Sequence, residues 1–385
     1  MPSRPMRPVM SRGKNICSVD DRRQKTKDSG KMLVALPSPT RAPIGKKFIR
    51  QKHVDKTGKL KIITPATYYE QWTEAVLESG IRNIRREYID LVRNYVPTGT
   101  QHAWEDDKNY YKNRYDDVRV LDNTRVILKD TPNKEDYINA SYVSVGDDMM
   151  LICAQGPMSN TIQDFWLMIV QEDVRVILQL CQFNENGKEQ CAEYLPDDKN
   201  WKEFGVVRVR CFEKPRTNLQ LKKVTQAKVQ VSYKDIKHEV MHILYSGWPD
   251  HFVAESASTC REVRALVLKY YRKKPIVVHC SAGVGRTGTY AAFEMAIQKI
   301  KKNKMLVIPD VARSVRDQRM GAIQNDQQYL FIYRMVLEIL IADQLLTKTP
   351  EIMDFIREYD DLVRRKRIEY AKKSSKSSKS AKNNA

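Results

Sequence analysis

A segment at residues 278–288 combines residue types that can bind a phosphate group and attack it. It reads VHCSAGVGRTG and continues the apolar run IVV. Its glycines allow a tight turn in which successive backbone N–H groups point inward, and such a turn at a helix start binds a tetrahedral anion. The loop backbone is therefore predicted to hold phosphate through Ser281, Ala282, Gly283, Val284 and Gly285.

Two side chains of this segment are candidates for the chemistry itself. Cys280 begins the loop and Arg286 ends it. The field that attracts phosphate also favours the thiolate form of a cysteine, so Cys280 is a candidate nucleophile. The guanidinium of Arg286 can bind two phosphate oxygens at once. The alternative is a structural cysteine in a strand-to-helix turn, and the arginine and two glycines at this spacing argue against it.

The elements that must position this loop can be read from hydrophobic periodicity. The run at 275–279 is predicted to be a short buried strand, and a helix pattern follows from Thr287. Further strands are predicted at 174–183, 205–212, 228–233 and 238–248. The residue pattern of 110–160 predicts strands connected by loops. The pattern indicates one α/β domain of strands flanked by helices.

Helices are predicted at both ends of this domain. Apolar residues from Pro65 to Leu91 recur at helical spacing, with a break at Gly80 that favours two short helices. Residues 326–345 are predicted to form a buried helix. A second helix at 346–370 is predicted to be amphipathic, with one apolar face made by Ile352, Phe355, Tyr359 and Leu362.

The net charge of +20 belongs to the two ends of the chain. Residues 1–60 hold 16 Lys/Arg and 4 Asp, and residues 364–385 hold 9 Lys/Arg and one Glu, so these segments carry +12 and +8. Residues 61–363 are neutral in sum. We expect a disordered basic extension at 1–60 and a disordered Lys/Ser tail at 371–385. Such tails are suited to acidic proteins, nucleic acid or an anionic membrane surface.

The cysteines and apolar runs bear on location. The seven cysteines are scattered and include no C-x-x-C pair, which argues against a zinc site or a disulfide framework and favours a reducing compartment. No apolar run approaches the ~18 residues of a membrane span, and the N-terminal residues MPSRPMRPVMSRGK lack the apolar core of a secretory signal. We expect a cytoplasmic protein, with the cluster RRKR at 364–367 also compatible with nuclear import.

Six further motifs accompany the loop in a fixed order. They are KNRYDDV (112–118), DYINASY (136–142), QGP (155–157), DFW (164–166), WPD (248–250) and RMGAIQNDQQ (319–328). With the segment HCSAGVGRTG, they resemble the signature of the classical non-receptor protein tyrosine phosphatases. The resemblance covers about residues 68–345. It implies a catalytic domain at 65–345 whose central, highly twisted mixed β-sheet is flanked by helices, and a reaction that needs no metal or organic cofactor.

The resemblance also implies roles for individual residues in hydrolysing phosphotyrosine on proteins. Cys280 matches the nucleophile that forms a cysteinyl-phosphate, Arg286 the phosphate clamp, and Asp250 the general acid and base on a mobile Trp-Pro-Asp loop that begins at Trp248. Thr287 matches the hydroxyl that assists departure of the thiolate. The remaining matches are Gln324 and Gln328, which position water, His279, which orients the loop, and Glu185, which steadies the arginine.

Substrate choice is implied by the motif KNRYDDV. Tyr115 matches the aromatic wall of a deep slot that phosphotyrosine can fill and that phosphoserine is too short to fill. Asp117 matches the carboxylate that accepts hydrogen bonds from the substrate backbone. Asp116 falls where some members carry a basic residue, which suggests a weaker preference for acidic peptides.

Several departures keep alternatives open. Phe252 and Ala254 follow WPD where the family usually has Gly and Pro, which help the loop to close. One alternative is therefore a catalytically weak, phosphotyrosine-binding scaffold, although Cys280, Arg286 and Asp250 are all present. A dual-specificity phosphatase would lack KNRYDDV, and a primary role in nucleic-acid or membrane binding is disfavoured by the neutral body.

Overall fold

The computed structural model describes residues 52–54, 60–62, 67–302 and 304–382, with side chains described within 67–302 and 304–369. The chain divides into two units, Met1–Thr64 and Pro65–Ala385. In the first unit, strands β1 (Lys52–Val54) and β2 (Leu60–Ile62) pair antiparallel. The rest of the expected disordered extension at 1–60 lies outside the described residues.

Within the described part of the second unit, ten strands form one mixed sheet. Their order is β3, β4, β5, β14, β6, β13, β12, β10 and β9, and β11 also pairs with β12. The neighbours β5, β14, β6 and β13 are parallel, and the other pairs are antiparallel. The bounds are β3 Arg125–Ile127, β4 Tyr137–Gly146, β5 Met149–Ala154, β6 Val176–Gln179, β9 Lys202–Phe204, β10 Val207–Cys211, β11 Arg216–Thr217, β12 Val224–Tyr233, β13 Ile236–Tyr245 and β14 Ile276–His279. A separate hairpin pairs β7 (Asn184–Glu185) with β8 (Lys188–Glu189).

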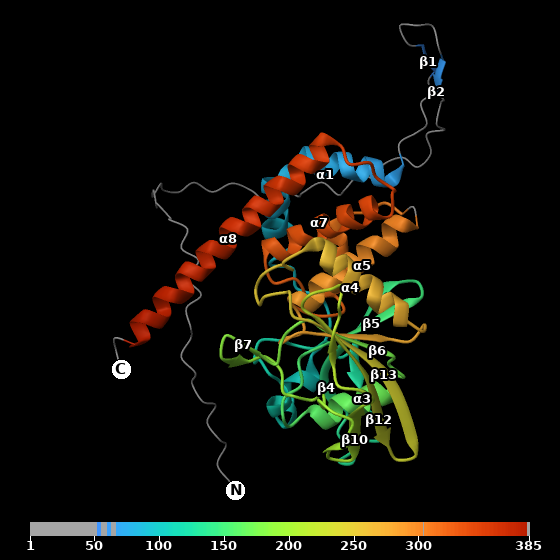
Figure 1. Cartoon of the computed structure of the whole chain (residues 1–385), viewed down its shortest axis with the longest axis vertical. Helices are drawn as coiled ribbons and strands as arrows, with labels where there is room; N and C mark the ends of the chain where they lie inside the picture. Colours follow the sequence, from blue (N-terminus) through green and yellow to red (C-terminus); the bar gives the residue numbers. More distant parts are fainter. Residues whose placement is uncertain (1–51, 55–59, 63–66, 303, 383–385) are drawn as a thin grey trace, which may run out of the picture. The chain divides into compact units, whose positions relative to one another are not determined.

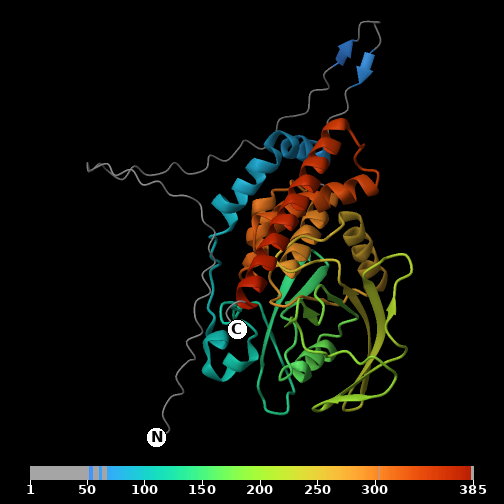
Figure 2. The ribbon, with the colours of Figure 1, turned by 60° about the vertical axis from the view of Figure 1, so that its left-hand side comes forward.

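The two central strands β6 and β14 are continuous runs that are buried along their whole length. This is typical of parallel strands covered on both faces. Strand β10 alternates between buried and more exposed residues, because one of its faces is less covered. The strands predicted around residues 174–183, 205–212, 228–233, 238–248 and 275–279 are all confirmed, and Figure 2 shows the twist of the long strands β12 and β13.

Helices cover both faces of the sheet. Helix α5 packs on β4, β5 and β14, α4 packs on β6 and β13, and α3 packs on β10 and β12. In Figure 1, α4, α5 and α7 lie above the strands, and α3 lies in the lower half of the body beside β4, β10 and β12. The bounds are α1 Tyr68–Glu87, the π-helix η1 Tyr88–Val92, α2 His102–Glu105, the 3-10 helix η2 Asp107–Lys112, α3 Ile162–Gln171, α4 Ala257–Tyr270, α5 Arg286–Lys301, α6 Ile308–Arg316, α7 Asp326–Ala342 and α8 Pro350–Lys382.

Local chemistry explains where several helices begin and break. Thr67 caps α1 by accepting a hydrogen bond from the Glu70 N–H, and the Glu70 carboxylate accepts one from the Thr67 N–H. Gly80 interrupts α1 with a φ of 65°, which confirms the break between two short helices. Asn325 caps α7 by accepting from the N–H groups of Gln327 and Gln328.

Helix α8 is longer than expected. Its predicted apolar face (Ile352, Phe355, Tyr359 and Leu362) is buried, and the helix runs beside α1 and α7 (Figure 2). The helix continues to Lys382, so the part of the Lys/Ser tail at 371–382 is helical rather than disordered. Alanine and lysine favour helix, and extending an existing helix avoids the cost of nucleation. Residues 383–385 lie outside the described residues.

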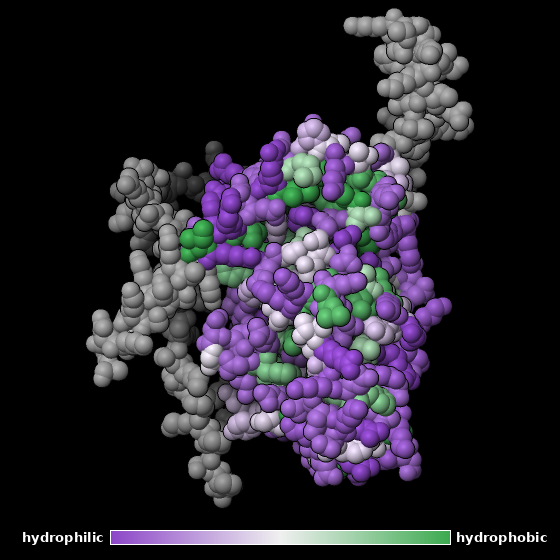
Figure 3. Space-filling view, in the orientation of Figure 1, coloured by the Kyte–Doolittle hydropathy of each residue, from purple (hydrophilic) through white to green (hydrophobic). Residues whose placement is uncertain are grey.

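The core lies between the sheet and the helices. Its largest fully buried side chains include Trp166, Trp248 and Tyr290. The face shown in Figure 3 is mainly hydrophilic, with apolar residues in small separate patches. None of the helices described for this chain combines the length and the apolar run that crossing a membrane requires.

Candidate active site

The candidate residues meet at the carboxyl ends of the four parallel strands. Strand β14 ends at His279, directly before Cys280, and β13 ends at Tyr245, shortly before Asp250. Strand β5 ends before the QGP motif, and β6 ends before Glu185. Parallel strands place their carboxyl ends on one edge of the sheet, which is where ligands bind in such folds.

The loop after β14 has its carbonyl groups turned outward. The Ser281 carbonyl accepts from the Gly156 N–H at 2.9 Å, and the Val284 carbonyl accepts from the Ile323 N–H at 3.0 Å. Arg319 donates to the carbonyls of Ala282 and Gly283 at 3.0 and 3.1 Å. With four consecutive carbonyls held from outside, the N–H groups of the loop are free to face its interior. Such an arrangement suits the anion-binding role that the sequence predicts for the loop.

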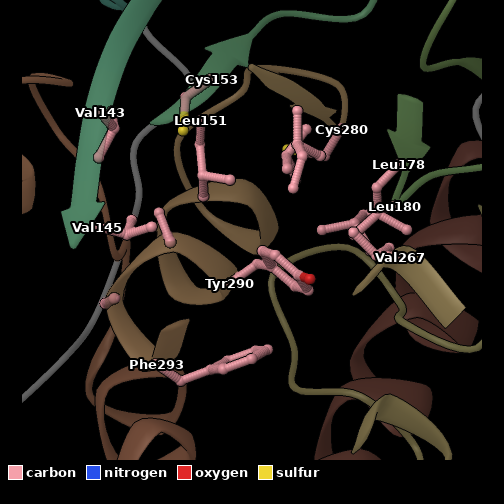
Figure 4. Close-up of a cluster of buried hydrophobic side chains, with 14 of the residues drawn as sticks. Val143, Val145, Leu151, Cys153, Leu178, Leu180, Val267, Cys280, Tyr290 and Phe293 are labelled. Carbon is pink, nitrogen blue, oxygen red and sulfur yellow. The ribbon is translucent and has the colours of Figure 1, made fainter. Parts of the chain in front are cut away.

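Cys280 lies at the base of this loop. Its side chain is buried, and the Gly283 N–H donates to its Sγ at 3.3 Å. Figure 4 shows Cys280 at the edge of a cluster of buried apolar side chains that includes Leu151, Cys153 and Leu178. The apolar base and the N–H group on Sγ suit the nucleophile role predicted for Cys280.

Gly283 is required both for its backbone conformation and for its lack of a side chain. Its φ is +71°, and an added Cβ would lie 2.2 Å from the Ala154 carbonyl oxygen. We expect Gly283→Ala to lower the free energy of unfolding by more than the ~1–2 kcal/mol of a left-handed alanine. We also expect kcat/KM to fall about 100-fold, because the displaced loop misaligns the N–H groups. Denaturant unfolding and steady-state kinetics measure both effects.

The matched control for this substitution is Gly187→Ala. Gly187 has a φ of +78° and nothing within 4 Å of an added Cβ. This variant should lose only the ~1–2 kcal/mol of unfolding free energy that a left-handed alanine costs, and it should keep its activity. Equal effects of the two substitutions would contradict the role given to the close approach at Ala154.

Arg286 is the first residue of α5 and is almost completely buried. Its Nη1 donates to the Glu185 carboxylate at 2.7 Å and to the carbonyls of Leu180 and Trp248 at 3.1 Å each. Its Nη2 donates to Asp250 Oδ1 at 3.0 Å. Burial alone would lower the pKa of this guanidinium, but the acidic groups around it, foremost Cys280, outweigh burial and raise the pKa. The cation is therefore fixed beside Cys280.

The segment that carries Asp250 is held against the site. The Trp248 indole N–H donates to the Phe252 carbonyl at 2.9 Å. The rings of Trp248 and Phe331 pack in a T-shaped arrangement with their centres 5.3 Å apart. The Asn325 amide donates to the His251 carbonyl at 3.0 Å. Phe252 itself is buried. The segment 248–252 thus lies over the loop at 280–286, which we call the cradle. The carboxylate of Asp250 contacts Arg286 there.

Three further candidates lie around the mouth of the loop. The side-chain oxygen of Gln328 (Oε1) accepts from the Gln324 backbone N–H at 2.9 Å, and the side-chain Nε2 of Gln328 donates to the Phe252 carbonyl at 3.4 Å. A Cβ on Gly285 would lie 2.1 Å from Gln324 Oε1, so this amide covers the end of the loop. The hydroxyl of Thr287 is buried and has no hydrogen-bond partner among the described residues.

The candidate substrate wall is only partly brought to the cradle. The Tyr115 hydroxyl lies 2.8 Å from the Ser281 Oγ, which ties the ring to the loop. Lys188 lies over the Tyr115 ring, with its Nζ 5.9 Å from the ring centre. Asp116 and Asp117 are exposed. The structure therefore joins Tyr115 to the site and leaves the carboxylates of Asp116 and Asp117 in solvent.

His279 is linked to two residues that the sequence analysis did not identify. Its Nδ1 lies 3.2 Å from the Cys280 carbonyl, and its Nε2 lies 2.7 Å from the Tyr194 hydroxyl. The same hydroxyl lies 2.9 Å from His242 Nε2. Burial lowers the pKa of His279 to about 4 and that of His242 to about 3, so both rings are neutral near pH 7. The carbonyl can only accept, so His279 carries its proton on Nδ1 and accepts from Tyr194.

These two histidines predict a pH dependence of stability. The unfolded chain protonates them near pH 6.5, whereas the folded chain keeps them neutral to about pH 4, so the unfolded state binds more protons between these values. The free energy of unfolding should therefore fall as the pH drops below about 6.5. Replacing His242 with glutamine should reduce the loss between pH 7 and pH 5 by about 2 kcal/mol. Urea unfolding at the two pH values measures this difference.

His102→Gln is the control, because His102 is largely exposed. It should leave the loss of stability on acidification unchanged. The same reduction in both variants, or no reduction in His242→Gln, would contradict the account of the buried pair.

Arg319 is another residue whose role was missed. It lies inside the quoted motif RMGAIQNDQQ, is fully buried, and supports the loop through two carbonyls. Its place inside that motif was the available signal. Tyr194 and His242 gave no such signal, because they reach His279 from distant parts of the chain.

Comparison with protein-family models finds a match over residues 109–338 to the model described as protein-tyrosine phosphatase. Among curated proteins, tyrosine-protein phosphatase non-receptor type 9 of Mus musculus is 34% identical over 281 residues, which are 67% of this chain and 46% of that protein. Protein-tyrosine-phosphatase PTP1 of Arabidopsis thaliana is 35% identical over 248 residues, which are 60% of this chain and 71% of that protein. This chain thus spans about half the length of the type 9 relative.

Comparison with solved structures gives the same result. A chain from the study titled "Structural basis of PTPN18 fingerprint on distinct HER2 tyrosine phosphorylation sites" aligns with a TM-score of 0.61 and 28% identity. The alignment covers 70% of this chain and 97% of that chain. The mixed sheet with helices on both faces is therefore the fold shared with this structure.

Proposed function

The chain belongs to the protein-tyrosine phosphatase family, and we propose that it hydrolyses phosphotyrosine on proteins through a cysteinyl-phosphate intermediate. The observation that carries the proposal is the meeting of three groups in one cradle. Cys280 lies at its base, Arg286 closes it, and Asp250 lies 3.0 Å from that arginine. A nucleophile, a fixed cation and a carboxylate are the three groups that cleavage of a phosphate monoester needs.

In the first step, the loop N–H groups and Arg286 bind the phosphoryl oxygens. The Cys280 thiolate attacks phosphorus, and the bond from phosphorus to the tyrosine oxygen breaks. Asp250 gives its proton to the departing oxygen, so the product leaves as neutral tyrosine. The outward carbonyls support this step, because they leave only N–H groups to meet the charge that develops on the phosphoryl group.

In the second step, water attacks the phosphorus of cysteinyl-phosphate. Asp250 takes the proton from this water, the sulfur–phosphorus bond breaks, and the thiolate and inorganic phosphate are regenerated. Gln328 and Gln324 stand at the mouth of the loop, where they can orient the water. The buried hydroxyl of Thr287 is available to donate to the departing sulfur. His279 holds the Cys280 carbonyl in place.

Selectivity for phosphotyrosine is proposed to come from the depth of the site. Cys280 is buried beneath a rim that includes the half-buried ring of Tyr115. An aryl phosphate spans this depth and packs on the tyrosine ring, whereas the shorter phosphoserine places its phosphorus above the sulfur. The exposed Asp117 is proposed to accept hydrogen bonds from the substrate backbone at the rim.

The test of this proposal compares two peptides of one sequence, one with phosphotyrosine and one with phosphoserine. We expect kcat/KM for the phosphotyrosine peptide to be at least about 100-fold higher. The phosphoserine peptide cannot bring its phosphorus atom within reach of the Cys280 sulfur in the orientation that attack requires. Phosphate release measures both rates. Equal rates would contradict the depth argument, and no release from either peptide would contradict hydrolysis.

A phosphotyrosine-binding scaffold is the second candidate. The observation that favours it is the buried Phe252, whose carbonyl accepts from both Trp248 and Gln328 and thereby fixes the loop over the site. A loop that opens slowly would bind phosphotyrosine and release product slowly. The peptide experiment separates the two candidates, since a scaffold binds the phosphotyrosine peptide without releasing phosphate.

We also propose a cytoplasmic location. The six cysteines among the described residues are all free and buried, which suits a reducing compartment. The basic ends are proposed to contact acidic partners or anionic surfaces. We expect the full chain to bind such a partner, and this binding to weaken steeply as the salt concentration rises. Residues 61–363 alone should not bind it.

A further inference from the structure

A polar groove separate from the loop at 280–286 lies between α8, α7 and the start of α4, and Ala254, at the end of the segment that carries Asp250, forms part of its wall. Its volume is about 580 Å³. The residues of interest on its walls come from three elements and are Ser256, Ser258, Arg334, Tyr359, Arg364 and Arg367. Figure 1 shows these helices on the same side of the sheet. None of these residues has a place in the hydrolysis described above.

Three residues of this groove carry hydrogen-bond donors without a partner. Among the described residues, no acceptor is found for Arg334 Nε, Tyr359 Oη, Arg367 Nε or Arg367 Nη2, and all four atoms are shielded from solvent. Arg334 and Tyr359 are buried, with only 8% and 4% of their surface exposed. Buried donors are almost always satisfied in proteins, so four of them around one groove indicate an acceptor that binds there.

The charges in the groove point to an anion. Arg334 also donates to Glu338 at 3.0 Å through Nη1, and Arg364 pairs with Asp361. Arg367 has no ion pair among the described residues. A half-buried guanidinium without a counterion is unfavourable, which makes an anionic ligand the natural partner.

Two acidic residues also line the groove. Glu255 is already paired with Lys223. Burial raises the pKa of Asp360, and the nearby Arg334 opposes this rise. Neither carboxylate accepts a hydrogen bond from Arg367 Nε or Nη2, so these two buried donors have no protein partner among the described residues.

The N-terminus of α4 also favours the binding of an anion in this groove. This helix has 14 residues, and its cap Ser256 accepts from the Thr259 N–H at 3.1 Å. The partial positive charge at a helix N-terminus favours an anion placed there. The hydroxyls of Ser256 and Ser258, which lie 2.9 Å apart, supply further polar contacts on the same wall.

We propose that this groove is a second phosphate-binding site, formed by Arg334, Tyr359 and Arg367. A carboxylate offers two oxygens, whereas the four donors here match a tetrahedral anion with three or four oxygens. The ligand class is therefore a phosphate group, either inorganic phosphate or a phosphorylated side chain. The site does not depend on Cys280 or on any step of hydrolysis.

The experiment measures binding of inorganic phosphate to the full chain by equilibrium dialysis at constant ionic strength. Phosphate also binds the catalytic loop, so Arg286→Met is used to weaken that site. We expect wild type to bind two phosphates per chain and Arg286→Met to bind one. Adding Arg367→Gln to Arg286→Met should abolish the remaining binding. Adding Tyr359→Phe should weaken it about fivefold to tenfold, the effect of one hydrogen bond.

The matched control is Arg357→Gln in the same Arg286→Met background. Arg357 lies on α8, is exposed, and pairs with Asp354. This variant should keep the second phosphate. One phosphate per wild-type chain, or binding that Arg367→Gln leaves unchanged in a folded protein, would overturn the proposal. Arg367→Gln alone should keep phosphotyrosine hydrolysis, so failure of the second site is distinct from failure of the catalytic proposal.

A phosphoserine peptide distinguishes the two sources of the ligand. If it binds Arg286→Met more tightly than inorganic phosphate does, and Arg367→Gln removes this binding, the ligand is a phosphorylated side chain. If only inorganic phosphate binds in an Arg367-dependent way, the ligand is the free anion. If neither probe binds, the groove is not a phosphate site.

Discussion

Cys280→Ser is expected to lower phosphotyrosine hydrolysis by about 10⁴-fold or more while leaving peptide binding largely intact. A serine hydroxyl remains protonated where a cysteine becomes a thiolate, and removing a nucleophile costs rate factors of about this size. The phosphate-binding N–H groups belong to the backbone, which the substitution does not change. Steady-state hydrolysis and peptide binding by fluorescence polarisation measure the two effects.

Cys153→Ala is the matched control for this prediction. Cys153 lies on β5 near Cys280 (Figure 4), and burial raises the pKa of its thiol to about 12. It is neutral near pH 7 and has no proposed role, so its removal should change kcat by less than about threefold if the protein stays folded. Loss of activity in both variants would indicate that the site is sensitive to packing, and would contradict a unique role for Cys280.

The second large effect is expected for Arg286→Lys, with kcat/KM falling by about 10³-fold or more. The guanidinium of Arg286 donates to Glu185, Asp250 and two carbonyls at once, and its buried Nε has no partner among the described residues. A lysine has three donors on one atom and cannot span these partners while binding two phosphoryl oxygens. Both binding and the chemical step should suffer, so KM should rise and kcat should fall.

The matched control is Arg264→Lys. Arg264 is also buried in an ion pair, with hydrogen bonds of 2.5 and 2.8 Å to Glu294, but it lies on α4 outside the cradle. This variant should lose stability and keep kcat/KM. Comparable losses of kcat/KM in the two folded variants would show that activity depends equally on any buried ion pair. This result would contradict the phosphate-binding role of Arg286.

The features that could be predicted from the sequence are those that depend on neighbouring residues. The strand β14, the turn after it and the start of α5 follow from one short segment with apolar, glycine and arginine residues in order. The break at Gly80 and the buried face of α8 follow from helical spacing. In each case the determining residues lie within a few turns of one another.

The features that could not be predicted depend on contacts between distant residues. Arg319 supports the loop from 36 residues away, and Tyr194 reaches His279 across 85 residues. Periodicity carries no information on such pairs. The composition of the Lys/Ser segment after residue 370 predicts a disordered tail, whereas α8 extends to Lys382 because it continues a helix already anchored by packing.

Phe252 illustrates a departure whose consequence only the structure shows. The sequence indicates a missing glycine beside Asp250, which suggests slower closure of the loop. In the structure, Phe252 is buried and its carbonyl accepts from Trp248 and Gln328. The backbone of residue 252 thus takes part in the contacts that hold this segment in place while its side chain is buried, and turnover should depend on how fast these contacts break.

The most direct test of the central claim is to trap the intermediate. The wild-type enzyme is mixed rapidly with a phosphotyrosine peptide carrying labelled phosphorus, denatured within one turnover, and digested for mass spectrometry. We predict that the label is on the sulfur of Cys280, and that Cys280→Ser carries none. Label on a different residue, or steady turnover with no labelled enzyme at any quench time, would contradict the mechanism.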